Sequence, residues 1–151
     1  MRYESHNEEE TKKIAADFVR DLQGGEVVFL SGELGSGKTT FVRGIAEALG
    51  FHEPVRSPSF TIVNRYPVEN VNIKQILHVD FYRIDDASEI PPLALEEEIG
   101  QPDTVTCIEW PEKAPSGMFV ATHQIICHGG DPYVFTITSL LPQREGFPRL
   151  L

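Results

Sequence analysis

The stretch GEVVFLSGELGSGKTT, residues 25–40, decides the fold of this chain. It opens with a short apolar run at residues 26–30, which is typical of a buried strand. Three glycines follow within six positions, and residues 38–50 then carry apolar side chains at helical spacing. A turn between a strand and a helix needs one or two such residues, so the glycines indicate a specialised loop. The sequence therefore predicts a strand, a glycine-rich loop and a helix in direct succession.

The loop matches the complete pattern G-x-x-x-x-G-K-[ST], from Gly32 to Thr39. Its glycines allow backbone N–H groups to wrap closely around a polyphosphate, where a side chain would block the approach. The following helix directs its positive end at the bound anion. Lys38 adds a fixed charge at the β- and γ-phosphates, and the hydroxyl of Thr39 is placed to ligate Mg²⁺. The pattern predicts a loop that binds a nucleoside triphosphate.

Outward from this loop, the first half of the chain alternates strands and helices, and the second half is richer in strands. A helix is expected at residues 7–25, and a short helix within 85–100. Strands are expected at 59–66, 74–84, 103–110, 118–128 and 133–140. This order predicts an α/β P-loop NTPase fold, with a mainly parallel central sheet, additional antiparallel strands and helices on both faces. We expect one domain over residues 1–151, with a loose tail from about residue 141.

Two acidic residues end apolar runs that resemble parallel strands. Asp80 closes ILHVD, and Glu109 closes VTCIE. In an open parallel sheet, ligands gather at the carboxyl ends of the strands. We expect one of these carboxylates to hold the metal, directly or through water, and the other to orient or activate the attacking water. The residues alone do not assign the two roles.

A proline-bent loop with three hydroxyl groups lies between the second helix and the next strand. Ser57, Ser59 and Thr61 stand in the segment SPSFT. Nucleotide hydrolases often keep a loop that senses the γ-phosphate at this point of the chain. An ordinary polar loop is the alternative interpretation.

Composition and charge limit the possible partners. The formal net charge is −10, so a phosphate-rich polymer is repelled on average and direct nucleic-acid binding is disfavoured. No apolar run approaches membrane-spanning length, and residues 1–30 lack the pattern of a signal peptide. We expect a cytoplasmic protein that does not bind membranes.

Several classes of P-loop protein do not fit. Guanine-specific proteins carry [NT]-K-x-D, which NIKQ at residues 72–75 does not match. Small-molecule kinases need an arginine-rich lid, whereas the 13 Lys and Arg residues here are scattered. A small ATPase fits best. A small-molecule kinase using the same loop and a nucleotide-responsive binding module remain as alternatives.

Five segments in a fixed order resemble the bacterial TsaE family, the ATPase component of the machinery that makes threonylcarbamoyladenosine in tRNA. They are GELGSGKTTFVRGIAEALG, VRSPSFTIVNRY, HVDFYRI, LEEEIG and CIEWPEKAP. The resemblance runs from the first helix to at least Pro115. The loop alone is not specific, but its combination with S-P-[ST]-F-T, H-x-D-x-Y-R and E-W-P is. Ser59 and Ser36 depart from the residues most common in the family, and neither change removes a donor that the mechanism needs.

The resemblance implies roles for individual residues. The phosphates would be held by Gly35, Ser36, Gly37, Lys38, Thr39 and Thr40. Mg²⁺ would be held by Thr39 and Glu109, with Asp80 assisting at the metal or the water. Thr61 would belong to a switch loop, Trp110 would lie beside the site, and Glu8 would contact the adenosine.

The resemblance also implies cofactors and partners. Members of the family bind ATP and hydrolyse it slowly with Mg²⁺. They act with TsaB and TsaD, so tRNA would be contacted only indirectly through that complex. An acidic surface is compatible with this arrangement, because the partners can supply the tRNA contacts.

Overall fold

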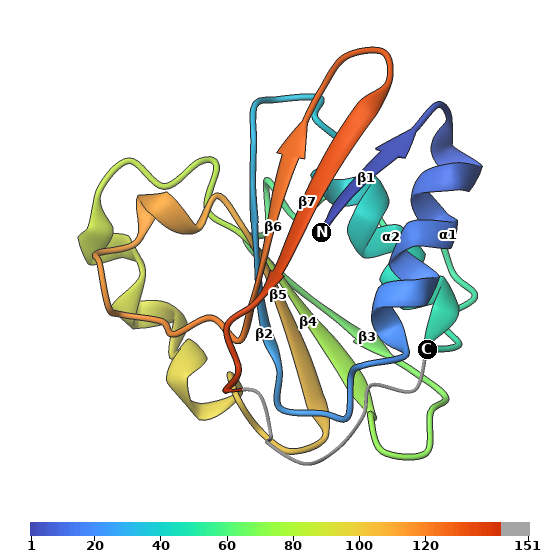
Figure 1. Ribbon diagram of the computed structural model, residues 1–151. Helices are drawn as coiled ribbons and strands as arrows, with labels where there is room; N and C mark the ends of the chain where they lie inside the picture. The colour runs from blue at the N-terminus through green and yellow to red at the C-terminus, as the bar shows by residue number, and fades with distance from the viewer. Residues whose placement is uncertain (143–151) are drawn as a thin grey trace.

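The computed structural model describes residues 1–142, whose strands form one seven-stranded mixed sheet (Figure 1). The strand order is β1-β7-β6-β2-β5-β4-β3. The strands are β1 (Arg2–Ser5), β2 (Val27–Ser31), β3 (Val63–Pro67), β4 (Gln75–Asp80), β5 (Thr104–Glu109), β6 (His123–His128) and β7 (Tyr133–Ser139). The four central strands are parallel to their central neighbours, whereas β3, β7 and β1 add antiparallel edges. The predicted mainly parallel sheet with antiparallel additions is confirmed.

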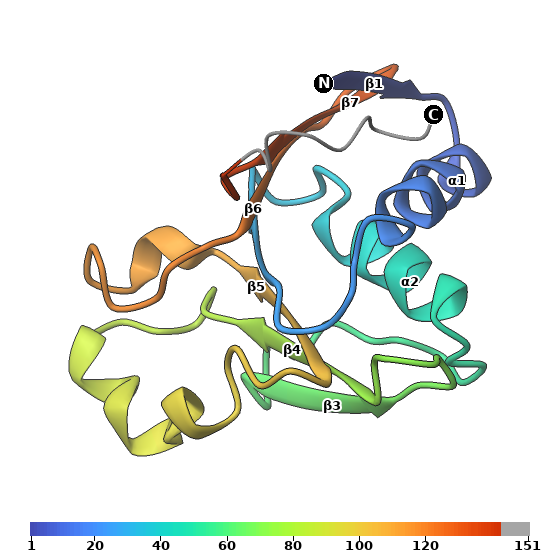
Figure 2. The ribbon, with the colours of Figure 1, turned by 60° about the horizontal axis from the view of Figure 1, so that its bottom comes forward.

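Helical segments cover both faces of this sheet, as predicted. The two α-helices, α1 (Glu8–Val19) and α2 (Lys38–Ala48), lie together on one face (Figure 2). Short 3-10 helices lie on the other face: η1 (Ala87–Glu89), η2 (Pro91–Leu93), η3 (Leu95–Glu97) and η4 (Pro111–Lys113). Among residues 1–142, no helix is long and apolar enough to span a bilayer.

The helix α1 begins and packs for reasons visible in the sequence. The side chain of Asn7 accepts a hydrogen bond of 2.8 Å from the backbone N–H of Glu10, which caps the first turn. Ala15 and Phe18 face inward, and the ring of Phe18 meets that of Phe41 on α2 edge-on, with 6.0 Å between centroids. This contact fixes α1 against α2, the helix that follows the glycine loop.

Two hydrophobic cores hold the layers together, because each strand of a covered sheet presents alternate side chains to opposite faces. On the α-helical face, Val28 and Leu30 of β2 pack against α1 and α2. On the other face, Val27 of β2 and Ile108 of β5 pack against Ile90 and other residues of the 3-10 segments. The strands β4 and β5 are thereby buried on both sides, whereas β6 leaves Ile126 and His128 exposed on one face.

Several boundaries differ from those expected from the sequence. The strand expected at 74–84 ends at Asp80, because the Oδ1 atom of Asp80 accepts from the N–H of Tyr82 and turns the chain. The helix expected within 85–100 is a series of 3-10 turns, since Pro91-Pro92 prevents a continuous helix. The strand β1 was not predicted. The predicted loose tail, about 141–151, lies almost entirely outside the described residues.

Candidate active site

The glycine loop spans residues 32–37, between the end of β2 and the start of α2, as predicted. Gly32 has a φ of +150°, and a Cβ atom there would lie 2.2 Å from the carbonyl oxygen of Cys127 on β6. Gly37 immediately precedes α2 with a left-handed φ of +98°. Only glycine meets both demands without strain. The loop therefore delivers the first backbone N–H groups of α2 at the end of the central strand.

Lys38 is held against the loop by its own backbone. Its ammonium group donates to the carbonyl oxygens of Gly32 at 2.6 Å and Glu33 at 2.8 Å. It also lies 4.5 Å from the ring centroid of Trp110, which is a cation–π distance. The side chain is almost completely buried. A fixed positive charge is thus placed at the loop and flanked by the one tryptophan of the sequence.

Thr39 and Glu109 meet beneath the loop. The hydroxyl of Thr39 donates to the carboxylate of Glu109, with distances of 3.1 and 3.2 Å to its two oxygens. Glu109 is 2% exposed and ends β5, directly beside β2 in the sheet. A hydroxyl and a carboxylate in contact form the kind of oxygen donor set that Mg²⁺ prefers. The residues present therefore fit a magnesium ion.

Asp80 ends β4 as the register partner of Glu109 on β5. Its Oδ2 atom accepts hydrogen bonds from the hydroxyls of Ser57 at 3.0 Å and Ser59 at 3.4 Å. Burial raises the pKa of the Asp80 carboxyl above its usual value, and the nearby charge of Glu109 raises it further. The two acids singled out in the sequence are thus adjacent, and one of them is tied to the SPSFT loop.

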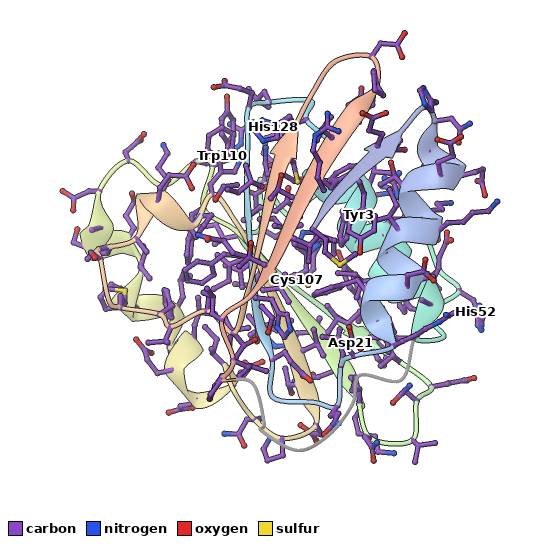
Figure 3. The ribbon with its side chains drawn as sticks, viewed as in Figure 1. Tyr3, Asp21, His52, Cys107, Trp110 and His128 are labelled. Atoms are coloured by element: carbon purple, nitrogen blue, oxygen red, sulfur yellow. The ribbon has the colours of Figure 1, made fainter. Side chains whose placement is uncertain are left out.

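A cleft of about 470 Å³ lies beside the glycine loop. Its lining combines the loop with the ends of β5 and β6: Gly32, Glu33, Trp110, Glu112, Ile126, Cys127, His128 and Gly129. Figure 3 shows Trp110 and His128 at the same end of the sheet, whereas Cys107 lies in the middle of β5. The cleft therefore lies at the carboxyl ends of the parallel strands, and Trp110 in its lining contacts Lys38.

Comparison with known proteins places the chain among close relatives. The model of the family described as "Threonylcarbamoyl adenosine biosynthesis protein TsaE" matches residues 5–131. The chain belongs to the TsaE family. Residues 1–4 and all of β7 lie outside the match.

Individual relatives agree with this assignment. The tRNA threonylcarbamoyladenosine biosynthesis protein TsaE of Aquifex aeolicus is 39% identical over 109 residues, covering 71% of this chain and 74% of that protein. The protein of the same name from Bacillus subtilis is 41% identical over 111 residues, covering 73% and 66% respectively. The crystal structure of YdiB from Bacillus subtilis superimposes with a TM-score of 0.69 at 32% identity, covering 93% of this chain and 85% of that one.

Other predicted site residues of this TsaE chain lie further from the two acids. The hydroxyl of Thr61 is exposed and donates to Asn64 at 3.0 Å, so in this conformation it is bonded to the start of β3. Glu8, at the first turn of α1, forms a 2.8 Å ion pair with Arg43 of α2. Thr40 is the third residue of α2 and is half-buried. The structure brings Lys38, Thr39, Asp80 and Glu109 together, and leaves Thr61 and Glu8 at the margins.

Two buried residues of the TsaE site were not singled out from the sequence. The Nε2 atom of His78 lies 2.6 Å from Oε2 of Glu109, and the Nδ1 atom lies 2.9 Å from the hydroxyl of Tyr66. His78 belongs to the quoted HVDFYRI segment and interrupts the apolar run of β4, between Leu77 and Val79. A polar side chain in a strand buried on both faces requires hydrogen-bond partners, and that was the available signal.

Proposed function

We propose that this TsaE chain binds ATP with Mg²⁺, hydrolyses it, and acts with TsaB- and TsaD-type proteins in the N6-threonylcarbamoyladenosine modification of tRNA. The observation that carries the proposal is the contact between Thr39 and Glu109 directly below Lys38 and the glycine loop. A positive charge, a metal-binding hydroxyl and a buried carboxylate are there assembled at one end of the sheet. This is the combination that phosphoryl transfer to water requires.

Binding of the triphosphate is assigned to residues 35–40. Their backbone N–H groups include those of the first turn of α2, which have no partner within the helix and carry its positive dipole end. Lys38 supplies the charge beside the β- and γ-phosphates, exchanging loop carbonyls for phosphate oxygens. Glu8 is proposed to lie near the adenosine, and its ion pair with Arg43 holds the start of α1 on α2.

Hydrolysis is assigned to the two acids and the loop that contacts one of them. Thr39 and Glu109 would hold Mg²⁺, which when bound neutralises charge on the phosphate oxygens. Asp80 is held by Ser57 and Ser59, and its raised pKa suits a group that accepts a proton from an attacking water. Thr61 is proposed to act with this loop as a switch that responds to the γ-phosphate.

Phosphate release from ATP tests the catalytic part of the proposal. We expect the purified chain to release phosphate only with Mg²⁺ present, and Lys38→Ala to abolish release. Lys13→Ala is the matched control, because Lys13 is an exposed lysine on α1. Full activity in Lys38→Ala would show that the glycine loop is not the catalytic nucleotide site.

The same assay separates two alternative functions. A small-molecule kinase transfers the phosphate only when an acceptor is supplied, so ATP alone would give no inorganic phosphate. A nucleotide-responsive binding module binds ATP, yet supports unchanged partner activity when Glu109 is replaced. Either result would replace the ATPase assignment.

Partner association is tested by co-purification. TsaB- and TsaD-type proteins are the expected partners because family members carry the name of the same tRNA modification. The net charge of −10 supports contact with tRNA through those partners and not through this chain. We expect the complex to form in an ATP-dependent manner and to speed phosphate release. Independent migration of all three proteins, with and without ATP, would contradict the partner assignment.

A further inference from the structure

A histidine is buried directly behind the carboxylate of Glu109. His78 lies on β4 with its side chain fully buried, and its Nε2 atom is 2.6 Å from Oε2 of Glu109. The carboxylate also accepts a hydrogen bond from the hydroxyl of Thr39, at the start of α2. Glu109 is therefore fixed between a residue of the glycine loop helix and a residue of the neighbouring strand.

The second nitrogen of His78 continues the chain of hydrogen bonds to the edge strand. Its Nδ1 atom lies 2.9 Å from the hydroxyl of Tyr66 on β3, where the antiparallel register places Tyr66 two pairs away from the Asn64–His78 pair and thus on the same face of the sheet. The Tyr66 hydroxyl also lies 3.2 Å from the carbonyl oxygen of Arg56. Arg56 directly precedes the SPSFT loop. Three groups, the Arg56 carbonyl, the Tyr66 hydroxyl and the His78 ring, thus connect the start of that loop to Glu109.

The donor and acceptor roles in this series of hydrogen bonds follow from the chemistry of its groups. A carboxylate only accepts, so the Nε2 atom of His78 carries the hydrogen that is donated to Glu109. In the neutral ring, Nδ1 is then an acceptor and takes the hydroxyl hydrogen of Tyr66. That hydroxyl has a single hydrogen, for which His78 and the carbonyl of Arg56 compete. A shift of the Arg56 backbone would therefore change the strength of the hydrogen bond between Tyr66 and the His78 ring.

The SPSFT loop reaches the other acid as well. Ser57 and Ser59, the first and third residues of that segment, donate to Asp80. The loop thus contacts Asp80 through side chains, and contacts Glu109 through the Arg56 carbonyl, Tyr66 and His78. A movement of this one segment acts on both carboxylates.

We propose that His78 and Tyr66 are positioning residues that hold Glu109 in its working orientation and tie that orientation to the backbone of residues 56–61. The proposal rests on the ATPase function proposed above. Residues that hydrogen-bond to the back of a metal-binding or catalytic group orient it, and their loss lowers activity by about 10- to 100-fold. Here they also connect the group to a loop that contacts the second acid.

Tyr66→Phe is the decisive variant, because it removes one hydroxyl and leaves the packed ring in place. We expect kcat for ATP hydrolysis to fall about tenfold, with the KM for ATP unchanged, because the glycine loop is intact. Tyr3→Phe is the matched control, since Tyr3 lies on β1 and its hydroxyl contacts only Met1 among the described residues. A wild-type kcat in Tyr66→Phe overturns the proposal.

Nitrogen NMR of the His78 ring gives a readout that does not depend on turnover. In the wild-type chain we expect a hydrogen on Nε2, donated to Glu109, and an Nδ1 resonance shifted by the Tyr66 hydrogen bond. In Tyr66→Phe the Nδ1 resonance should move toward that of an unbonded nitrogen. Identical ring resonances in both proteins would show that Tyr66 does not orient His78.

A double-mutant cycle tests whether the two residues act in series. If Tyr66 acts only through His78, Tyr66→Phe should cause no further loss of kcat in a His78→Gln background. Multiplicative losses overturn the series arrangement. Should His78→Gln fail to fold, the kcat of Tyr66→Phe and the ring resonances decide the question alone.

The activities of the wild-type chain and of Lys38→Ala distinguish failure of the positioning role from failure of the proposed ATPase function. If the wild-type chain releases no phosphate from ATP with Mg²⁺, both proposals are overturned. If Lys38→Ala abolishes release while Tyr66→Phe behaves as wild type, only the positioning role is lost.

Discussion

Asp80 and Glu109 are direct register partners at the ends of the parallel strands β4 and β5, and both are almost fully buried. Like charges at adjacent buried positions oppose each other, which is consistent with the raised pKa of Asp80. Such an arrangement does not help the chain to fold. Carboxylates kept together at a cost in stability are typical of sites that bind a cation or move a proton.

Replacing Glu109 by Gln should separate charge from shape. The amide can keep a hydrogen bond to Thr39 and to His78, but it lacks the negative charge that the proposed metal site needs. We expect phosphate release to fall by at least about a hundredfold, as when a group that stabilises developing charge is removed. Glu97→Gln, at an exposed position of η3, is the control. Wild-type turnover in Glu109→Gln would leave Asp80 as the only essential acid.

Asp80 should make stability depend on pH in a definite direction. Because burial raises its pKa in the folded chain, the folded state retains this proton to higher pH than the unfolded state. The free energy of unfolding therefore falls as pH rises from the usual carboxyl range through the raised pKa. We expect Asp80→Asn to be more stable than wild type at neutral pH, with the difference shrinking toward acid pH.

Urea unfolding of both chains between about pH 4 and pH 8 measures this difference. Asp21→Asn, at an exposed position after α1, should give no such pH-dependent gap. A constant gap between wild type and Asp80→Asn across the range would contradict a raised pKa as its cause. Asp80→Asn is also expected to lose ATPase activity, so stability and activity change in opposite directions.

The site residues that lie close together in the sequence could be predicted from the sequence alone. The glycine loop, Lys38 and Thr39 were predictable because the residues of a strand–loop–helix unit are adjacent in the chain. The convergence of Asp80 and Glu109 was also predictable, since parallel strands bring their carboxyl ends to one edge. These predictions needed no knowledge of the strand order.

The His78 and Tyr66 contacts depend on strand order and register, which a single sequence does not supply. His78 meets Glu109 because β4 lies beside β5, and Tyr66 meets His78 because β3 pairs with β4 in one particular register. A shift of one residue would reverse the face of each side chain. Similarly, β1 has only Ser5 fully buried, so no apolar alternation marks it, and only its pairing with β7 makes it a strand.

Gly32→Ala should destabilise the chain more than an ordinary glycine substitution. The new Cβ would collide with the Cys127 carbonyl on β6, in addition to the strain of a φ near +150°. Backbone strain of this kind costs about 1–3 kcal/mol before the collision is counted. Gly117→Ala is the matched control, because its φ is also positive but nothing lies within 4 Å of the added carbon. Equal losses of unfolding free energy in the two variants would refute the close approach of β6 to the loop.

The reactivity of the two cysteine thiols should show whether the core around β5 and β6 opens without unfolding of the chain. Burial raises the pKa of the Cys127 thiol to about 12, and it raises that of Cys107 further, so neither forms a reactive thiolate at neutral pH. We expect a disulfide reagent at about pH 8 to label no thiol in the folded chain and both thiols in denaturant. Because the Cys127 carbonyl lies beside Gly32 of the glycine loop, ATP with Mg²⁺ should slow any labelling that proceeds through unfolding, by stabilising the folded state. Rapid labelling of either thiol in the folded chain would show that the core around β5 and β6 opens without unfolding.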